Sequence, residues 1–301
     1  MKPIIITDSN CDLNGDYLTD NKIAVIPIRF YLKGDKMPLI PSYNYLIEKD
    51  PNDLTEYMTY SEFYDEIRGD GIATTSQISP YDFKRYFNIY ASKGYPIIYI
   101  GFSSGLSNTL DNAILARQEI MDEDKEADIT IIDTKSATSG QGLLVYYAAE
   151  MLKGGSTKNE VINWIEENSL KVNVWFTVDD LEQLKRGGRI SQTTANLGTL
   201  LNVKPVLRID KFGKLVPTQR VRGRKRALIE LFEQLKANIV NSKEQIIFIN
   251  HGDCIEDAEY LKSLITDKIE VKDVIINYTG PVIGTHTGAG ILSVAFLGTA
   301  E

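Results

Sequence analysis

"PIIYIGFSSGLSNTLDNAILARQEIM", residues 96–121, begins as a strand and ends as a helix. Residues 96–102 are apolar in succession rather than alternately, as in strands that are buried on both faces. A turn rich in hydroxyl groups follows, in which Ser107 or Asn108 can cap the helix. A strand, a turn and a helix in this order are the repeating unit of a parallel α/β sheet.

The same unit recurs on both sides of this stretch. Short β-rich runs occupy residues 3–7, 24–30 and 127–133, and a further helical pattern begins just after the capping candidate Ser79. These repeats predict an α/β fold whose N-terminal α/β/α domain, residues 1–170, contains a parallel sheet.

The second half of the chain follows another pattern. Two helix-like stretches fill residues 139–169, after which residues 204–210 and 214–220 are typical of a hairpin. We expect a C-terminal α+β domain with a mixed sheet over residues 171–301, and a domain change near residue 170. Residues 33–58, which carry prolines, clustered charges and tyrosines, indicate a long surface excursion within the first domain.

The composition is that of a globular protein. Of 301 residues, 43% are hydrophobic and 25% are charged, and no apolar run approaches the roughly 20 residues that cross a bilayer. The formal net charge of -8 argues against a general nucleic-acid binder, because such binding depends on neutralising phosphates. The N-terminus lacks the apolar core of a signal peptide, so we expect a cytoplasmic protein.

The two cysteines, Cys11 and Cys254, are far apart in the sequence. Neither belongs to a pattern of metal ligands, so we expect reduced thiols and no metal site.

Hydroxyl-rich segments follow the expected strands at residues 7–13, 74–79, 101–109 and 133–142. In a parallel sheet such segments meet at the carboxyl edge, where ligands bind. Hydroxyl groups and the free N–H groups of helix starts together favour an anion, so the pattern predicts a carboxylate or phosphate site. The alternative is that these serines only cap helices, namely Ser79, Ser107 and Ser139.

His286 lies in "GPVIGTHTGAG", residues 280–290, and is one of only two histidines. The glycines permit positive φ angles, so we expect a shaped loop around a small polar site. The alternative is a histidine that merely hydrogen-bonds a neighbouring turn.

Several motifs occur in the order and approximate spacing of one known family: "IITDSNCDL", "TTSQIS", "SSGLSNT", "IIDTKSATSGQG", "GGRIS", "NVKPVLRIDKFGKLVPTQRVRGRKRAL", "HGDC" and "GPVIGTHTGAG". This set spans nearly the whole chain and resembles the DegV family of fatty-acid-binding proteins. The resemblance implies a two-domain α/β protein that holds one long-chain fatty acid in a tunnel between its domains. It also implies that the carboxylate is presented to a separate fatty acid kinase for conversion to acyl phosphate. The protein would then be a lipid carrier whose ligand is the fatty acid, with no catalytic residues and no cofactor.

The resemblance also implies which residues hold the carboxylate. They are Thr75, His286 and a serine of residues 103–109, for which Ser107 is favoured over Ser104. A protonated His286 would give a charge-assisted hydrogen bond, and its pKa is expected to rise beside the anion. Asn108 and Ile78 stand where the family usually has glycine and proline.

Two enzymatic alternatives remain at this stage. A serine hydrolase needs an activated serine, and the sequence has no GxSxG elbow. A small-substrate binder similar to the substrate subunit of dihydroxyacetone kinase is the closer rival, although no P-loop or kinase signature is present.

Two dense basic runs occupy residues 185–191 and 220–226. A nucleic-acid surface and a solvated face are both possible interpretations. The resemblance favours a third, in which Arg189, Arg222 and Arg224 frame the carboxylate opening and dock the kinase. We further expect a monomer with no membrane span, and a transient contact with a membrane is left open.

Overall fold

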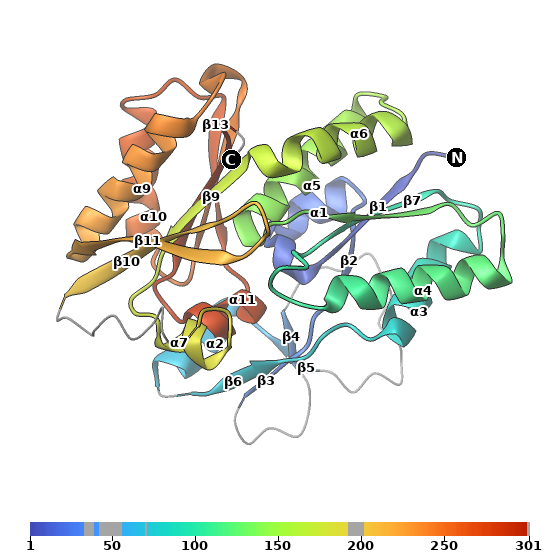
Figure 1. Cartoon of the computed structure of the whole chain (residues 1–301), viewed down its shortest axis with the longest axis horizontal. Coiled ribbons are helices and arrows are strands. Elements are labelled where there is room, and N and C mark those ends of the chain that lie inside the picture. Colours follow the sequence, from blue (N-terminus) through green and yellow to red (C-terminus); the bar gives the residue numbers. More distant parts are fainter. Residues whose placement is uncertain (33–38, 42–55, 70, 192–201, 300–301) are drawn as a thin grey trace.

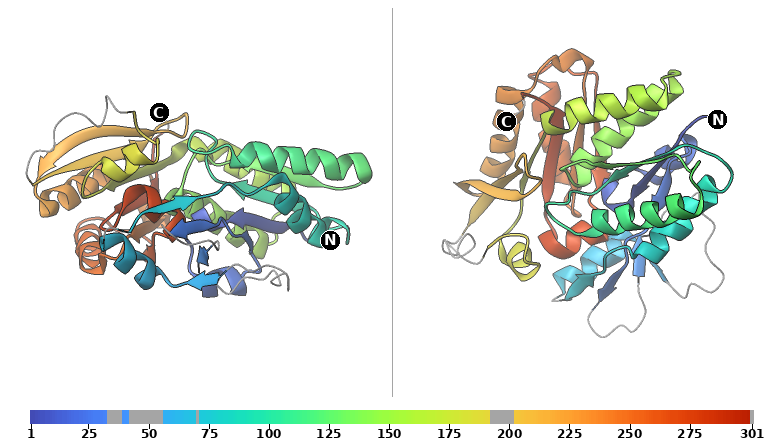
Figure 2. Two further views of the ribbon diagram at one scale, coloured as in Figure 1. Left: turned by 90° about the horizontal axis from the view of Figure 1, so that it is seen from below. Right: turned by 45° about the vertical axis from the view of Figure 1, so that its right-hand side comes forward.

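The computed structural model describes residues 1–32, 39–41, 56–69, 71–191 and 202–299, with backbone only for 39–41 and 56–57. Three sheets and the helices around them make up this part of the chain (Figure 1). Seen from below, α4 and the β10–β11 hairpin lie at opposite ends of the molecule (Figure 2).

The first sheet has four strands, all parallel, in the order β2 (Ala24–Ile26), β1 (Ile4–Asp8), β7 (Ile97–Gly101) and β8 (Ile129–Asp133). One face packs against α3 (Pro80–Ala91) and α4 (Thr109–Glu123). The other packs against α1 (Gly15–Asp20), α5 (Thr138–Lys153) and α6 (Lys158–Asn168). The predicted parallel sheet with helices on both faces is therefore confirmed.

The second sheet has six strands and is mixed. Its order is β11 (Leu215–Arg222), β10 (Val203–Ile209), β9 (Val172–Thr177), β14 (Leu292–Leu297), β12 (Ile246–His251) and β13 (Asp273–Tyr278). Only β12 and β13 pair in parallel among the described strands of this sheet. Strands β10 and β11 form the predicted hairpin.

Helices cover both faces of this sheet. Helices α9 (Arg224–Asn238) and α10 (Ile255–Thr266) pack on one face. Apolar residues of α5 share a core with Val174 and Phe248 on the other face and with Ile98 and Ile100 of the first sheet. Helix α5 therefore joins the two sheets. The division into domains near residue 170 stays a prediction.

A third, small sheet corrects the expected strand at residues 24–30. That stretch forms two strands, because β2 ends before Pro27 and β3 (Phe30–Leu32) joins another sheet. Proline has no N–H group for a ladder, so a break there is expected. Strand β3 pairs with β4 (Leu39–Pro41) and β6 (Ala73–Thr75), and β4 pairs with β5 (Glu56–Met58). The expected surface excursion thus contains two strands, and its remaining residues lie outside the described part.

The expected loop around His286 is a short helix, α11 (Pro281–Thr287). Pro281 occupies the first turn, which needs no N–H group from it. Gly280 and Gly284 have no positive φ, whereas Gly288 ends the helix with a φ of 80° and Gly290 has a φ of 78°. The helix packs against α2 (Tyr60–Arg68), where a side chain at Gly284 would meet the Tyr64 hydroxyl at 2.7 Å.

Short elements complete the described chain: η1 (Ser9–Cys11), η2 (Ser169–Lys171), α7 (Glu182–Arg186) and η3 (Ser242–Glu244). Over the described ranges, every helix is too short or too polar to span a lipid bilayer.

Candidate ligand-binding pocket

A cavity of about 510 Å³ lies where the three sheets approach one another. Its walls come from the ends of the N-terminal strands, from β9 and the β10–β11 hairpin, and from α7 and α11. Most of the lining is aliphatic or aromatic, including Ile28, Phe102, Leu106, Val174, Phe176, Leu184, Ile209, Leu215, Val282 and Ile291. Such a lining suits the apolar body of a ligand.

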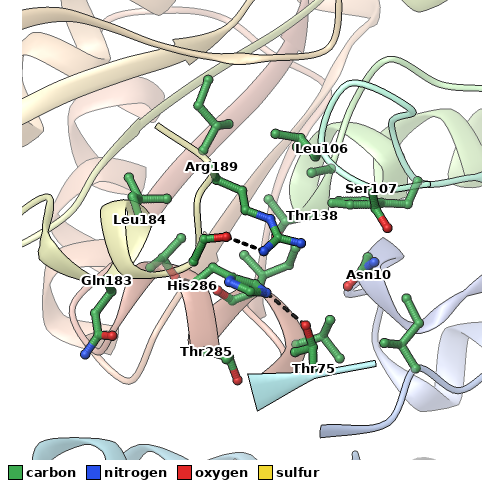
Figure 3. A pocket seen from close by; sticks show the side chains of 18 of the residues that line it. Asn10, Thr75, Leu106, Ser107, Thr138, Gln183, Leu184, Arg189, Thr285 and His286 are labelled. Carbon is green, nitrogen blue, oxygen red and sulfur yellow. Dashed lines mark hydrogen bonds between the residues drawn. The ribbon is translucent and has the colours of Figure 1, made fainter. Parts of the chain in front are cut away.

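The four hydroxyl-rich segments all reach this cavity. They contribute Asn10, Thr75, Ser107 and Thr138 to its lining, as Figure 3 shows. The parallel sheet brings three of them together, because the segments at residues 7–13, 101–109 and 133–142 leave its strands at the same edge. The segment at residues 74–79 does not follow a strand of this sheet as expected, because Thr75 ends β6 of the small sheet.

A buried carboxyl group holds two of these segments in place. Asp8, at the end of β1, accepts hydrogen bonds from the Tyr99 hydroxyl, the Phe102 N–H and the Gln141 side chain, at 2.9, 3.0 and 3.2 Å. Phe102 begins the segment after β7, and Gln141 lies in the first turn of α5. Burial raises the pKa of Asp8, and these hydrogen bonds oppose the rise. Nothing in the sequence singled out Asp8 for this role.

The polar end of the pocket is built around His286. Its Nε2 atom lies 3.0 Å from Oγ1 of Thr75, which reaches it from β6 (Figure 3). On its other side the ring faces Gly187, where an added side-chain carbon would lie 2.4 Å from Nδ1. A glycine at residue 187 is therefore required for this position of the ring.

Arg189 lies beside His286 in the same lining. Its guanidinium donates a hydrogen bond to the Gly187 carbonyl, and burial lowers its pKa. Burial and the Arg189 charge together lower the pKa of His286 to about 4. His286 is therefore neutral at neutral pH in this arrangement. The expected rise refers to the pocket with an anion in it and stays a prediction.

Of the serines in the segment after β7, Ser107 lines the pocket. Its Oγ atom lies 2.9 Å from Oγ1 of Thr109 and accepts the Thr109 N–H at the start of α4. Ser104 is not among the lining residues, and its hydroxyl accepts a hydrogen bond from Lys135. Ser103 donates to the Gly213 carbonyl.

The N-cap alternative holds for one of the three serines. Ser79 accepts the Asp82 N–H and caps α3. Asn108 is the N-cap residue of α4, although its side chain makes no capping bond. Ser139 is buried in α5, 3.0 Å from the hydroxyl of Ser293.

The two other arginines that were expected beside Arg189 do not line the pocket. Arg222 is exposed on β11. Arg224, the first residue of α9, donates to the Asp257 carboxylate at 2.7 Å, which offsets its charge at the helix start. Arg189 is different, because it lines both this pocket and the adjoining surface hollow at Lys214 and Val216.

The resemblance led us to expect Arg189 at the carboxylate opening, but sequence reasoning missed the part that α7 and Gly187 play in the pocket. Gln183, Leu184, Gly187 and Arg189 all contribute to the lining. The "GGR" run was visible, but only the structure shows that its first glycine faces the histidine ring. No cluster of three or more metal-ligating side chains is found over the described residues.

The fold and the pocket define a class of α/β protein with a parallel and a mixed sheet and a mostly apolar pocket that has a polar end. A family model described as "Uncharacterised protein, DegV family" matches residues 2–299, and the chain belongs to this family.

Known relatives align with this chain along nearly their whole length. A DegV domain-containing protein of Clostridium perfringens is 42% identical over 300 residues, covering 100% of this chain and 99% of the relative. Two solved structures are similar. One describes fatty acid binding of a DegV family protein from Thermus thermophilus, with 30% identity, a TM-score of 0.83 and coverage of 99% and 100%. The other is DegV, a fatty acid binding protein from Bacillus subtilis, with 28% identity, a TM-score of 0.78 and coverage of 99% and 100%.

Proposed function

We propose that this chain binds one long-chain fatty acid, with its alkyl chain in the apolar part of the pocket and its carboxylate at the Thr75–His286 end. The single observation that carries the proposal is that the mostly apolar cavity has polar groups, Thr75 and His286, at one end. The relatives from Thermus thermophilus and Bacillus subtilis, described as fatty acid binding, support it.

At the polar end, the carboxylate accepts hydrogen bonds from the hydroxyls of Thr75 and Ser107 and from the His286 ring. The Arg189 guanidinium supplies a positive charge beside it, in surroundings that exclude much of the water. Charge-assisted hydrogen bonds in such a place are stronger than neutral ones. A bound anion also stabilises the protonated ring of His286, which raises its pKa from the low value in the pocket.

At the apolar end, the alkyl chain gains free energy from burial. A saturated chain of 16 carbons gains on the order of 10 kcal/mol, at about 0.8 kcal/mol per methylene, before the costs of association. This gain is large enough for a lipid to stay bound during purification.

We further propose that a separate fatty acid kinase phosphorylates the presented carboxylate and that this chain is the lipid carrier. Arg189 and Arg222 are the proposed docking residues, with Arg224 beside them. A serine hydrolase is a poorer interpretation, because the described partner of the His286 ring is Thr75, and Ser107 pairs with Thr109. A separate small-substrate function would need a polar lining, whereas most of this lining is apolar.

Native mass spectrometry of the purified protein, followed by lipid extraction, tests the binding proposal. We expect a mass increase that corresponds to one fatty acid per chain. Lipid-free protein that takes up no fatty acid of 14 to 20 carbons in a saturable way would refute it. For the carrier proposal, acyl phosphate should form only when the loaded chain, a fatty acid kinase and ATP are mixed.

A further inference from the structure

A second cavity, of about 570 Å³, shares no lining residue with the fatty-acid pocket. It lies between the start of α1, helix α10 and the ends of β12 and β13. His251 and Tyr278, the last residues of these two strands, form part of its wall. Ligands of α/β proteins commonly bind at the carboxyl ends of parallel strands, and β12 and β13 are such a pair.

The cavity is lined by acidic groups. Asp12, Asp16 and Glu259 contribute carboxyl groups, and no lysine or arginine is among the described residues of the lining. Asp16 and Glu259 are exposed, whereas Asp12 is only 2% exposed. The charge of this site therefore favours a positively charged ligand.

The buried carboxyl group of Asp12 distinguishes this cavity from a cluster of exposed acidic residues. The Thr138 hydroxyl and the Gly280 N–H lie near the Asp12 carboxyl group and favour its ionised form, but neither oxygen makes a hydrogen bond of normal geometry in the described part of the chain. A side-chain carbon at Gly280 would lie 2.6 Å from its Oδ1 atom, so a glycine there leaves room for the carboxyl group. Buried polar groups are normally paired, and a buried carboxyl group that lines a cavity without a well-formed hydrogen bond can accept one from a ligand.

A second buried group in the lining lacks a partner. The side-chain amide nitrogen of Asn277 has no acceptor within the described residues, and Asn277 is 8% exposed. Its donor suits a ligand that carries an oxygen atom next to its charge.

Aromatic rings complete the wall. The Tyr278 ring lies 5.5 Å from the Tyr60 ring and 4.3 Å from the His251 ring. The Nδ1 atom of His251 accepts the Cys254 N–H, and burial lowers its pKa, so this histidine is neutral and does not compete with a cation. Tyrosine rings attract ammonium and guanidinium groups through their π faces.

We propose that this cavity is a binding site for a small organic cation, an amine or quaternary ammonium compound with a neighbouring hydroxyl group, with Asp12 as its buried counter-charge. Burial raises the pKa of Asp12 well above its ordinary value, and the Thr138 hydroxyl and the Gly280 N–H only partly oppose this. A cation beside the carboxyl group favours its ionised form, so the charge pair forms as the ligand binds.

Pairs of charged and neutral ligands test the proposal. Choline is compared with 3,3-dimethylbutan-1-ol, and ethanolamine with ethylene glycol, by ligand-observed NMR at constant ionic strength. We expect one of the cations to bind in a saturable way with a dissociation constant of about 1 mM or below, and its neutral partner to bind at least about tenfold more weakly.

Variants locate the binding. Glu259→Gln should weaken it about threefold, and Asp12→Asn at least about tenfold. Glu256→Gln is the matched control, because it removes the same charge from the same helix outside the lining, and it should leave binding unchanged. If Asp12→Asn does not fold, the comparison of Glu259→Gln with Glu256→Gln decides.

Three results would overturn the proposal: no saturable binding of either cation up to about 10 mM, equal binding of the neutral partners, or equal weakening by the two glutamate variants. Fatty acid content, measured in the same samples, is expected to stay unchanged, so this site can fail without affecting the fatty-acid proposal.

Discussion

The N-terminal and C-terminal parts of the chain contribute to the fatty-acid pocket in different ways. Thr75 ends β6 of the small sheet. Ser107 and Thr138 lie in the segments that follow β7 and β8, and the Asp8 carboxyl group ties these two segments to β1. His286 and Arg189 instead come from a seven-residue helix and a glycine turn that hold each other in place. The N-terminal hydroxyl groups thus come from strand ends and the segments after them, whereas the ionisable groups come from a local contact between two short elements.

The largest effect should follow from breaking that local contact. Gly187→Val places carbon atoms where the His286 ring lies, so the ring must leave Thr75. Overpacking and loss of a charged hydrogen bond together should weaken fatty acid binding by roughly 3 to 4 kcal/mol. Lipid titration of the delipidated variant measures this.

Gly154→Val is the matched control for this variant. Gly154 also follows a helix with a φ of -72°, and a carbon there meets only backbone carbonyls at 3.4 Å. The control should bind as the wild type does. Full binding by Gly187→Val would mean that the contact does not position His286.

A pH dependence of stability should follow from the same contact. The pKa of His286 is lowered to about 4 in the folded lipid-free chain and is about 6.5 when unfolded. Between these two pH values the unfolded state therefore binds more protons than the folded state. The contribution of His286 to the free energy of unfolding is fully present above pH 6.5 and is lost as the pH falls towards 4. The loss should reach up to about 3 kcal/mol.

Urea unfolding of delipidated protein at several pH values measures the slope of the free energy of unfolding against pH. His286→Asn should flatten it, while the second histidine, His251, is the same in both proteins. Bound fatty acid should also flatten it, because the anion raises the pKa of His286. Equal slopes with and without His286 would show that its ring is not titrating in this way.

Smaller effects on fatty acid binding are expected when single polar groups are removed from the N-terminal or the C-terminal part of the pocket. Thr75→Val, Ser107→Ala and His286→Ala should each weaken fatty acid binding by about 1 to 3 kcal/mol, and their combination should cost less than the sum. Ser104→Ala should bind normally, since Ser104 lies outside the lining. Weaker binding by Ser104→Ala with normal binding by Ser107→Ala would reverse the serine assignment.

The smallest effect should come from the exposed surface. Arg222→Glu should slow acyl-phosphate formation with a fatty acid kinase and ATP by a few-fold, as raised salt does, and leave lipid content unchanged. Lys93→Glu, which makes the same charge change at another exposed residue, is the control. Equal rates for both variants and wild type would remove Arg222 from the docking surface.

The sequence predicted the part of the pocket that regular structure creates. Successive apolar residues at 97–100 and the helix starts after them were sufficient to predict a parallel sheet and the meeting of the hydroxyl-rich segments at 7–13, 101–109 and 133–142. The segment at 74–79 was wrongly assigned to the same sheet, because Thr75 ends β6 of the small sheet. The hairpin of β10 and β11 was equally clear from its turn residues.

The rest depends on contacts between residues far apart in the sequence. Gly187 and His286 meet only in the folded chain, so the glycines around His286 were interpreted as a loop, although two of them are needed for close packing and a helix start. The buried carboxyl group of Asp12 was equally hidden, because burial and hydrogen-bond geometry are properties of the fold.

The central claim is that a fatty acid carboxylate lies at the Thr75–His286 end of the pocket. Carbon-13 NMR of protein loaded with carboxyl-labelled palmitate tests it most directly, by following the carboxyl resonance as the pH falls. We expect one resonance from bound palmitate, with the chemical shift of an ionised carboxylate even below the usual carboxyl pKa of about 4 to 5. The pKa of the bound carboxyl group should be higher in both His286→Ala and Thr75→Val. A resonance that titrates like free fatty acid, or is the same in wild type and both variants, would contradict the account.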